Sequence, residues 1–218
     1  TVVSAAYTDG ERRILTYGTD ETIRVWTAAA GAPIAKVEHK GLAGAVFNHG
    51  PRIWSWSEDG FVQAWDGASL QSRGSIPTRD RLSGVTLDPE GNRLLTWNGG
   101  VLKLWDALRL EAIGSLMDHG RTLEGVSFTA AGLVTWSSDG VVRLWDYATQ
   151  KAYTTWHLGA LTGATIDTRN GRLVTWSDDG SVSIVRLRAT PAQPSGLRRL
   201  DVEVRTGTRL LPTGELEA

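Results

Sequence analysis

The sequence contains no cysteine, which excludes disulfide scaffolds and any zinc, iron–sulfur or thiol chemistry that depends on Cys. It has no apolar run approaching the ~18–20 residues of a membrane helix. It also does not begin with a charged segment followed by an apolar one, which is the pattern of a signal peptide. Neither charge dominates, since 23 Lys+Arg stand against 24 Asp+Glu. Balanced charge argues against a broad electrostatic nucleic-acid binder and against a polybasic membrane-surface protein. We therefore expect a cytoplasmic protein without a membrane or nucleic-acid partner.

Tryptophan and glycine are abundant instead, with 10 and 25 residues. One aromatic series recurs about every 40 residues and ends in a valine where the fifth tryptophan would fall. Its members are Trp26, Trp65, Trp105, Trp145 and Val185. A second series keeps the same period: Tyr17, Trp56, Trp97, Trp136 and Trp176. Two series with one period indicate an internal repeat of five units.

Each unit contains the same succession of short apolar runs and turns. An alternating run, such as 42–48, opens it, and a second run, such as 93–98, leads into a Gly-containing dipeptide. These dipeptides are Asp59-Gly60, Gly99-Gly100, Asp139-Gly140 and Asp179-Gly180. They suit two-residue hairpin turns in which both central residues take a positive φ. A third run ends in Trp-Asp, and a looser fourth run follows.

Runs of this length with a period of two residues predict antiparallel strands, and no segment keeps a helical period. The chain is thus predicted to be all-β, with five four-stranded meanders. Their expected limits are 2–41, 42–80, 81–120, 121–159 and 160–210, with a loop insertion near 189–196 and a tail at 211–218.

One meander sheet cannot bury both of its faces alone. Sheets stacked side by side around an axis would cover one another, which is the β-propeller arrangement. The tryptophans would then fill the gaps between sheets, and their number requires no ligand.

On its period, its Trp-Asp strand ends and its Asp-Gly turns, the segment 2–187 resembles the WD-repeat family of β-propellers. The second strands read Thr-Trp-Ser or Ser-Trp-Ser where the family usually has Ser-Gly-Ser. That variant is similar to the WD-repeat arrays of large bacterial multidomain proteins, in which a nucleotide-binding signalling module, kinase or protease domain often precedes the array. The tail 203–218 also resembles the segment that closes such arrays.

The resemblance implies a structural hydrogen-bonded tetrad in each well-formed unit, here called a blade. It links a His before the first strand, a Ser or Thr on the second, an Asp in the hairpin and the third-strand Trp. Two blades supply all four residues: His39, Ser55, Asp59 and Trp65 in the second, and His119, Thr135, Asp139 and Trp145 in the fourth. We expect the Asp to be buried and paired.

The other blades depart from this pattern. The fifth offers His157, Thr175 and Asp179, but Val185 replaces its tryptophan. The third lacks the hairpin Asp, and the first has no His. We expect the third and fifth blades to be weaker than the second and fourth.

No catalytic, metal or cofactor site is expected, and we do not expect this segment to be an enzyme. A Ser/Thr–His–Asp set that recurs in several blades is structural, because an active site is needed once, and no nucleophile-elbow motif supports it. The four His residues stand in separate units without metal-ligand spacing. The Gly-Gly pair lies in a hairpin and not in a phosphate loop.

Five blades are fewer than the seven with which the family usually closes. We expect this segment, which begins without Met, to be part of a larger ring, while a complete five-bladed ring is the alternative. A partial ring would leave apolar faces for missing blades, a partner chain or another copy.

The predicted function is a non-catalytic protein–protein interaction or sensor module that serves effector or signalling domains of a larger bacterial assembly. The alternatives are an architectural scaffold and a propeller enzyme that uses a central channel. The residues expected to form the partner-binding rim border the hairpin Asp: Thr19, Glu58, Asn98, Ser138 and Asp178.

Overall fold

The computed structural model describes residues 1–8, 12–47, 52–167, 171–187, 209–210 and 216–217. All regular structure in these residues is β-strand, and none of it is helix. The all-β prediction is confirmed. Consequently no helix in the described part of the chain is long and apolar enough to cross a bilayer.

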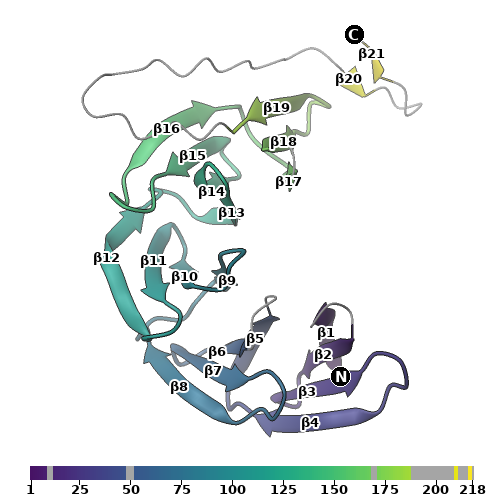
Figure 1. The fold of residues 1–218 in the computed structure, drawn as a ribbon. Helices are drawn as coiled ribbons and strands as arrows, with labels where there is room; N and C mark the ends of the chain where they lie inside the picture. Colours follow the sequence, from purple (N-terminus) through teal and green to yellow (C-terminus); the bar gives the residue numbers. More distant parts are fainter. Residues whose placement is uncertain (9–11, 48–51, 168–170, 188–208, 211–215, 218) are drawn as a thin grey trace. The chain divides into compact units, whose positions relative to one another are not determined.

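Four sheets contain four antiparallel strands each, paired in sequence order (Figure 1). Sheet 1 has β1 (Val2–Thr8), β2 (Arg13–Gly18), β3 (Thr22–Thr27) and β4 (Pro33–Glu38). Sheet 2 has β5 (Leu42–Phe47), β6 (Arg52–Ser57), β7 (Phe61–Asp66) and β8 (Ser72–Pro77). Sheet 3 has β9 (Gly84–Leu87), β10 (Arg93–Asn98), β11 (Val101–Asp106) and β12 (Glu111–Asp118). Sheet 4 has β13 (Leu123–Thr129), β14 (Gly132–Ser137), β15 (Val141–Trp145) and β16 (Ala152–His157).

Sheet 5 has three described strands, β17 (Gly163–Asp167), β18 (Arg172–Trp176) and β19 (Val182–Arg186). The expected insertion at 189–196 and a fourth strand, which sequence alternation places at 199–205, lie outside the described residues. In the tail, a short pair joins β20 (Arg209–Leu210) to β21 (Leu216–Glu217). Contacts divide the chain into two compact units, Thr1–Leu116 with sheets 1–3 and Met117–Ala218 with sheets 4 and 5, and β12 crosses the boundary.

Every sheet has two distinct faces. We call front face the one that carries the second-strand hydroxyl residue: Thr16, Ser55, Thr96, Thr135 and Thr175 in sheets 1 to 5. The back face is the opposite one. Because strand side chains alternate between faces, the third-strand Trp shares the front face, and the in-step aromatic series, which includes Trp56 and Trp136, lies on the back.

Within each unit, the back face of one sheet packs on the front face of the next. In the first unit, Leu15 and Val25 of sheet 1 cluster with Ile53 and Trp65 of sheet 2. The back face of sheet 2, with the fully buried Trp54, packs likewise on sheet 3. In the second unit, Val134 and Leu144 of sheet 4 cluster with Leu173 and Val185 of sheet 5. Burial of these side chains, at roughly 25 cal/mol per Å² of apolar surface, is the main force that holds neighbouring sheets together.

Arginines at the start of second strands add a hydrogen bond between sheets. Arg13 donates to the Gly67 carbonyl of sheet 2 at 3.1 Å, and Arg52 donates to the Ala107 carbonyl of sheet 3 at 2.5 Å. Each acceptor is the residue directly after the Trp-Asp pair, so the repeat in sequence becomes a repeat of inter-sheet contacts.

The hairpins between second and third strands differ from the prediction. Three residues, and not two, join β6 to β7, and Gly60 is the one among them with a positive φ, 83°. Its amide donates to the Ser57 carbonyl at 3.2 Å, as in a three-residue loop that ends in a left-handed residue. The Asp keeps an ordinary φ because its carboxylate then folds back onto the loop, as Asp139 does toward the Val141 amide at 3.3 Å.

Sheet 3 alone has a two-residue hairpin, Gly99-Gly100, with Gly99 at a φ of 55°. In sheet 1, Glu21 takes the left-handed position, with a φ of 56°.

Candidate functional site

The front face of sheet 4 holds a continuous line of hydrogen bonds. Trp145 Nε1 donates to Thr135 Oγ1 at 2.8 Å, and Thr135 Oγ1 lies 2.8 Å from His119 Nδ1. His119 Nε2 lies 3.1 Å from Ser137 Oγ, which donates to the Asp139 carboxylate at 2.5 Å. His119, Thr135 and Ser137 are at most 1 % exposed, so the line runs from the interior to the hairpin.

The chemistry of its two ends fixes the direction of this line. An indole N–H can only donate, and a carboxylate can only accept. Ser137 donates to Asp139 and therefore accepts from His119 Nε2–H. Since a neutral imidazole has one N–H, its Nδ1 accepts from the Thr135 hydroxyl.

The lowered pKa of the ring agrees with a neutral histidine. Burial, assisted by the Arg143 charge, lowers the pKa of His119 from 6.5 to about 4. At the other end, the hydrogen bond from Ser137 is the main cause that lowers the pKa of Asp139. The network thus contains a neutral ring and a charged carboxylate at physiological pH.

Sheet 2 repeats most of this geometry. Trp65 Nε1 donates to Ser55 Oγ at 2.7 Å, and Ser55 Oγ lies 2.6 Å from His39 Nδ1. Ser57 donates to the Asp59 carboxylate. Burial also lowers the pKa of His39, against the opposing charge of Asp59.

In sheets 2 and 4 the structure therefore brings His, hydroxyl and Trp together directly, and in sheet 4 the Asp joins them through Ser137. Sequence reasoning missed Ser57 and Ser137, although both stand at the same position of the repeat. The expectation of a buried Asp is wrong, because Asp59 is exposed and the Asp139 side chain is 44 % exposed. The reason is the three-residue hairpin, which carries the carboxylate beyond the end of the strands.

The remaining sheets hold smaller parts of the network. Trp26 donates to Thr16 at 2.8 Å, and Trp105 donates to Thr96 at 2.9 Å. In sheet 1, Asp20 accepts from the Thr22 hydroxyl at 2.7 Å.

In sheet 5, the assignment of His157 was wrong by one residue. His157 is exposed at the end of β16, where it pairs with Val141 in sheet 4. The Leu158 amide donates to the carbonyl of Gly140, the last residue of the hairpin in sheet 4. The His39 amide makes the corresponding bond in sheet 1, to the carbonyl of the last hairpin residue, Glu21. Leu158 therefore holds the histidine position and packs in the core between sheets 4 and 5.

The five proposed rim residues are all exposed at the tips of the hairpins that follow second strands. Thr19, Glu58 and Ser138 each open a three-residue loop. Asp178 is the second residue of a five-residue loop, and Asn98 ends β10 because its hairpin is shorter. Glu58 pairs with Arg81 at 2.9 Å, and Asp178 accepts from the Thr162 hydroxyl at 2.8 Å.

Sequence reasoning also missed the partners of the back-face tryptophans. Each of Trp56, Trp97, Trp136 and Trp176 pairs across strands with a glycine. A Cβ built on these glycines would lie 2.1–2.4 Å from indole carbon Cζ2. The four glycines are Gly44, Gly84, Gly125 and Gly163. Their regular spacing was a signal available in the sequence, since only glycine lets the ring lie against the strand.

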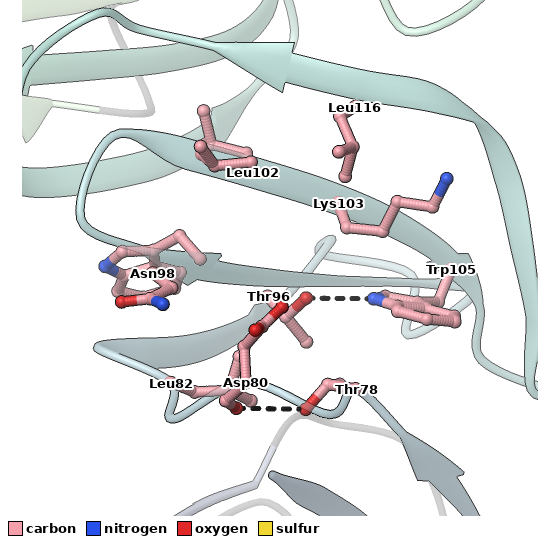
Figure 2. Close-up of a pocket in the computed structure, with 11 residues that line it drawn as sticks. Thr78, Asp80, Leu82, Thr96, Asn98, Leu102, Lys103, Trp105 and Leu116 are labelled. Atoms are coloured by element: carbon pink, nitrogen blue, oxygen red, sulfur yellow. Dashed lines mark hydrogen bonds between the residues drawn. The ribbon is translucent and has the colours of Figure 1, made fainter.

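A pocket of about 400 Å³ lies on sheet 3, and Figure 2 shows its lining. Thr78 and Asp80, from the segment after β8, and Thr96 and Trp105, from β10 and β11, supply polar groups. Leu82 supplies apolar wall. The described residues contain no group of three or more His, Asp or Glu that could hold a metal ion.

A scan against models of protein families finds no match, and a search of curated proteins finds none either. Function therefore has to be inferred from the geometry of the repeats.

Proposed function

We propose that the chain is a WD-repeat-type array, that its sheets are blades of a β-propeller, and that it is a non-catalytic protein-binding module. It would serve effector or signalling domains of a larger bacterial assembly. The observation that carries this proposal is the exposure of one polar hairpin tip per sheet, at Thr19, Glu58, Asn98, Ser138 and Asp178. A stiff scaffold that repeats exposed loops is suited to recognition.

The buried network favours a structural use of the hydroxyls over a catalytic one. Ser55 and Thr135 are fully buried, and each accepts from a tryptophan and contacts a histidine. A hydroxyl nucleophile needs access to substrate and a nearby oxyanion site. The same arrangement in two sheets stabilises the scaffold that carries the rim.

Exposed apolar side chains on two sheet faces favour a second kind of contact, with further blades. In three observed contacts, a back face covers a front face. On the back of sheet 5, Trp176 is 40 % and Ile184 is 38 % exposed, whereas Leu144, which corresponds to Ile184, is 1 % exposed. On the front of sheet 1, Tyr7 is 67 % exposed. The occupant that fits the back of sheet 5 is the front face of another sheet of this repeat type.

Charge reversal tests the rim. The double variant Glu58→Lys, Asp178→Lys should lose co-purifying partner proteins by about tenfold, while its melting temperature stays near that of the parent. The ion pair of Glu58 with Arg81 is exposed on both sides and contributes little to stability.

The matched control is Glu90→Lys, Glu111→Lys, which reverses two exposed charges away from these hairpin tips. Partners that bind the rim should be retained by this control. If both variants retain the same partners, the rim is not the recognition surface.

A further inference from the structure

Sheet 3 lacks the histidine that sheets 2 and 4 place on their front faces. The main chain identifies the corresponding position, because the amide of His39 donates to the Glu21 carbonyl and the amide of Thr78 donates to the Gly60 carbonyl. Glu21 and Gly60 are the left-handed residues of successive hairpins. Thr78 therefore stands where His39 stands. Its short side chain donates to the Gly60 carbonyl at 2.8 Å.

The space beside Thr96 is the pocket seen in Figure 2. Thr96 is 3 % exposed, and its Oγ1 accepts from Trp105 Nε1 at 2.9 Å. A threonine hydroxyl has one donor and two acceptor sites. No described residue accepts from the Thr96 O–H, whereas the corresponding Ser55 and Thr135 each contact a histidine ring nitrogen.

The pocket also offers an acceptor opposite this donor. Figure 2 shows the Asp80 side chain pointing toward Thr96 from the segment after β8. The Lys103 ammonium donates to the Gly114 carbonyl at 2.8 Å, so a backbone acceptor holds it. Leu82 is buried and forms apolar wall.

We propose that sheet 3 binds an imidazole ring from outside the chain, in the space that His39 and His119 fill in their own sheets. One ring nitrogen accepts from the Thr96 hydroxyl, as His119 Nδ1 does from Thr135. The other donates its N–H to the Asp80 carboxylate, which takes the acceptor role that Ser137 has in sheet 4. A volume of about 400 Å³ exceeds what one ring needs and lies in the range of small-molecule sites, so a ring with an attached chain fits. The ring can belong to a free imidazole compound or to a histidine of a peptide.

The Trp105 indole N–H signal in NMR reports on this site directly. Imidazole should shift it in a saturable way, and pyrrole, which has no acceptor nitrogen, should not. Asp80→Asn should weaken imidazole binding by about tenfold and leave the fold intact, because Asp80 is exposed. An absent shift with imidazole, or an equal shift with pyrrole, would overturn the proposal.

The variant Thr78→His supplies the ring from within the chain. It should raise the melting temperature and abolish the imidazole-induced shift of Trp105, whereas Thr78→Ser should do neither. Imidazole binding that persists unchanged in Thr78→His would contradict the assignment. Histamine and a blocked Gly-His-Gly peptide then distinguish the two sources, since the natural type of ligand should bind more tightly than the other.

Discussion

Thr135 is the central residue of the best-formed network. It accepts from Trp145 and donates to His119, and all three side chains are at most 4 % exposed. Its hydroxyl therefore satisfies two buried polar groups at once. Buried groups left without a partner each cost about 1–3 kcal/mol, so this single oxygen has a large effect on stability.

Replacement of Thr135 by valine keeps the shape and removes the hydroxyl. We expect Thr135→Val to lower the free energy of unfolding by about 2–4 kcal/mol in urea titrations, because an indole N–H and an imidazole nitrogen lose their partner. Thr135→Ser, which keeps the oxygen, should lose much less. Thr96→Val should also lose less, since Thr96 satisfies only Trp105. Equal losses for the two valine variants would contradict the role of the histidine.

The neutral state of His119 predicts how stability depends on pH. Its pKa is about 4 in the folded chain, against 6.5 for an ordinary histidine, so the unfolded chain takes up the proton first as pH falls. Stability should therefore fall between pH 6.5 and pH 4 by about 1–3 kcal/mol, with His39 adding in the same direction.

The aspartates affect stability at a lower pH than the histidines do. The pKa of Asp139 and that of Asp146 are lowered, so their contribution to stability is present above pH 3.8 and is lost as pH falls below it.

A His119→Asn variant should show a smaller change of stability with pH between pH 6.5 and pH 4, measured by urea titration. An unchanged slope would show that His119 is charged in the folded chain.

At the scale of strands, the glycine–tryptophan pair explains why the first strands of sheets 2 to 5 carry a glycine. Gly125 lies opposite Trp136, and a Cβ there would lie 2.1 Å from the ring. Gly125 is not among the glycines with a positive φ, so the requirement comes from packing and not from backbone conformation.

A double-mutant cycle separates these two causes. Gly125→Ala alone should destabilise the chain by about 1–3 kcal/mol, because the ring must move. Combined with Trp136→Ala, the same substitution should cost little, which gives a coupling energy of similar size in thermal and urea unfolding. Additive losses would mean that the glycine is needed for its backbone and not for the ring.

Strand identity and order could be predicted from the sequence because the period of two residues recurs in every unit and a Gly-containing turn marks the hairpin in four of the five. Hairpin geometry could not, because Asp-Gly is compatible with both two- and three-residue loops, and the hydrogen bonds of the Asp decide between them. The choice of Leu158 over His157 depends on a main-chain bond that residue type does not encode. The correspondence between Thr78 and His39 also depends on a main-chain hydrogen bond, so it can be recognised only in the folded structure.

At the scale of the whole molecule, back faces cover front faces in each of the three contacts between sheets described above. The back of sheet 5 and the front of sheet 1 carry exposed apolar side chains, such as Trp176 and Tyr7. The two faces are of opposite type, so copies of the chain can join head to tail, in a contact that need not close. Further blades of the same repeat type would occupy the same surfaces.

Light scattering on a sizing column, with the 218-residue chain over a range of concentrations, measures whether these faces bind one another. We expect self-association that rises with concentration for the parent chain, and monomers for the variant Trp176→Ser, Ile184→Ser. The control Leu108→Ser, which changes a 74 % exposed leucine between β11 and β12, should associate like the parent. A parent chain that stays monomeric and melts cooperatively at all concentrations would show that the exposed faces of sheets 1 and 5 need no further blade, against this expectation.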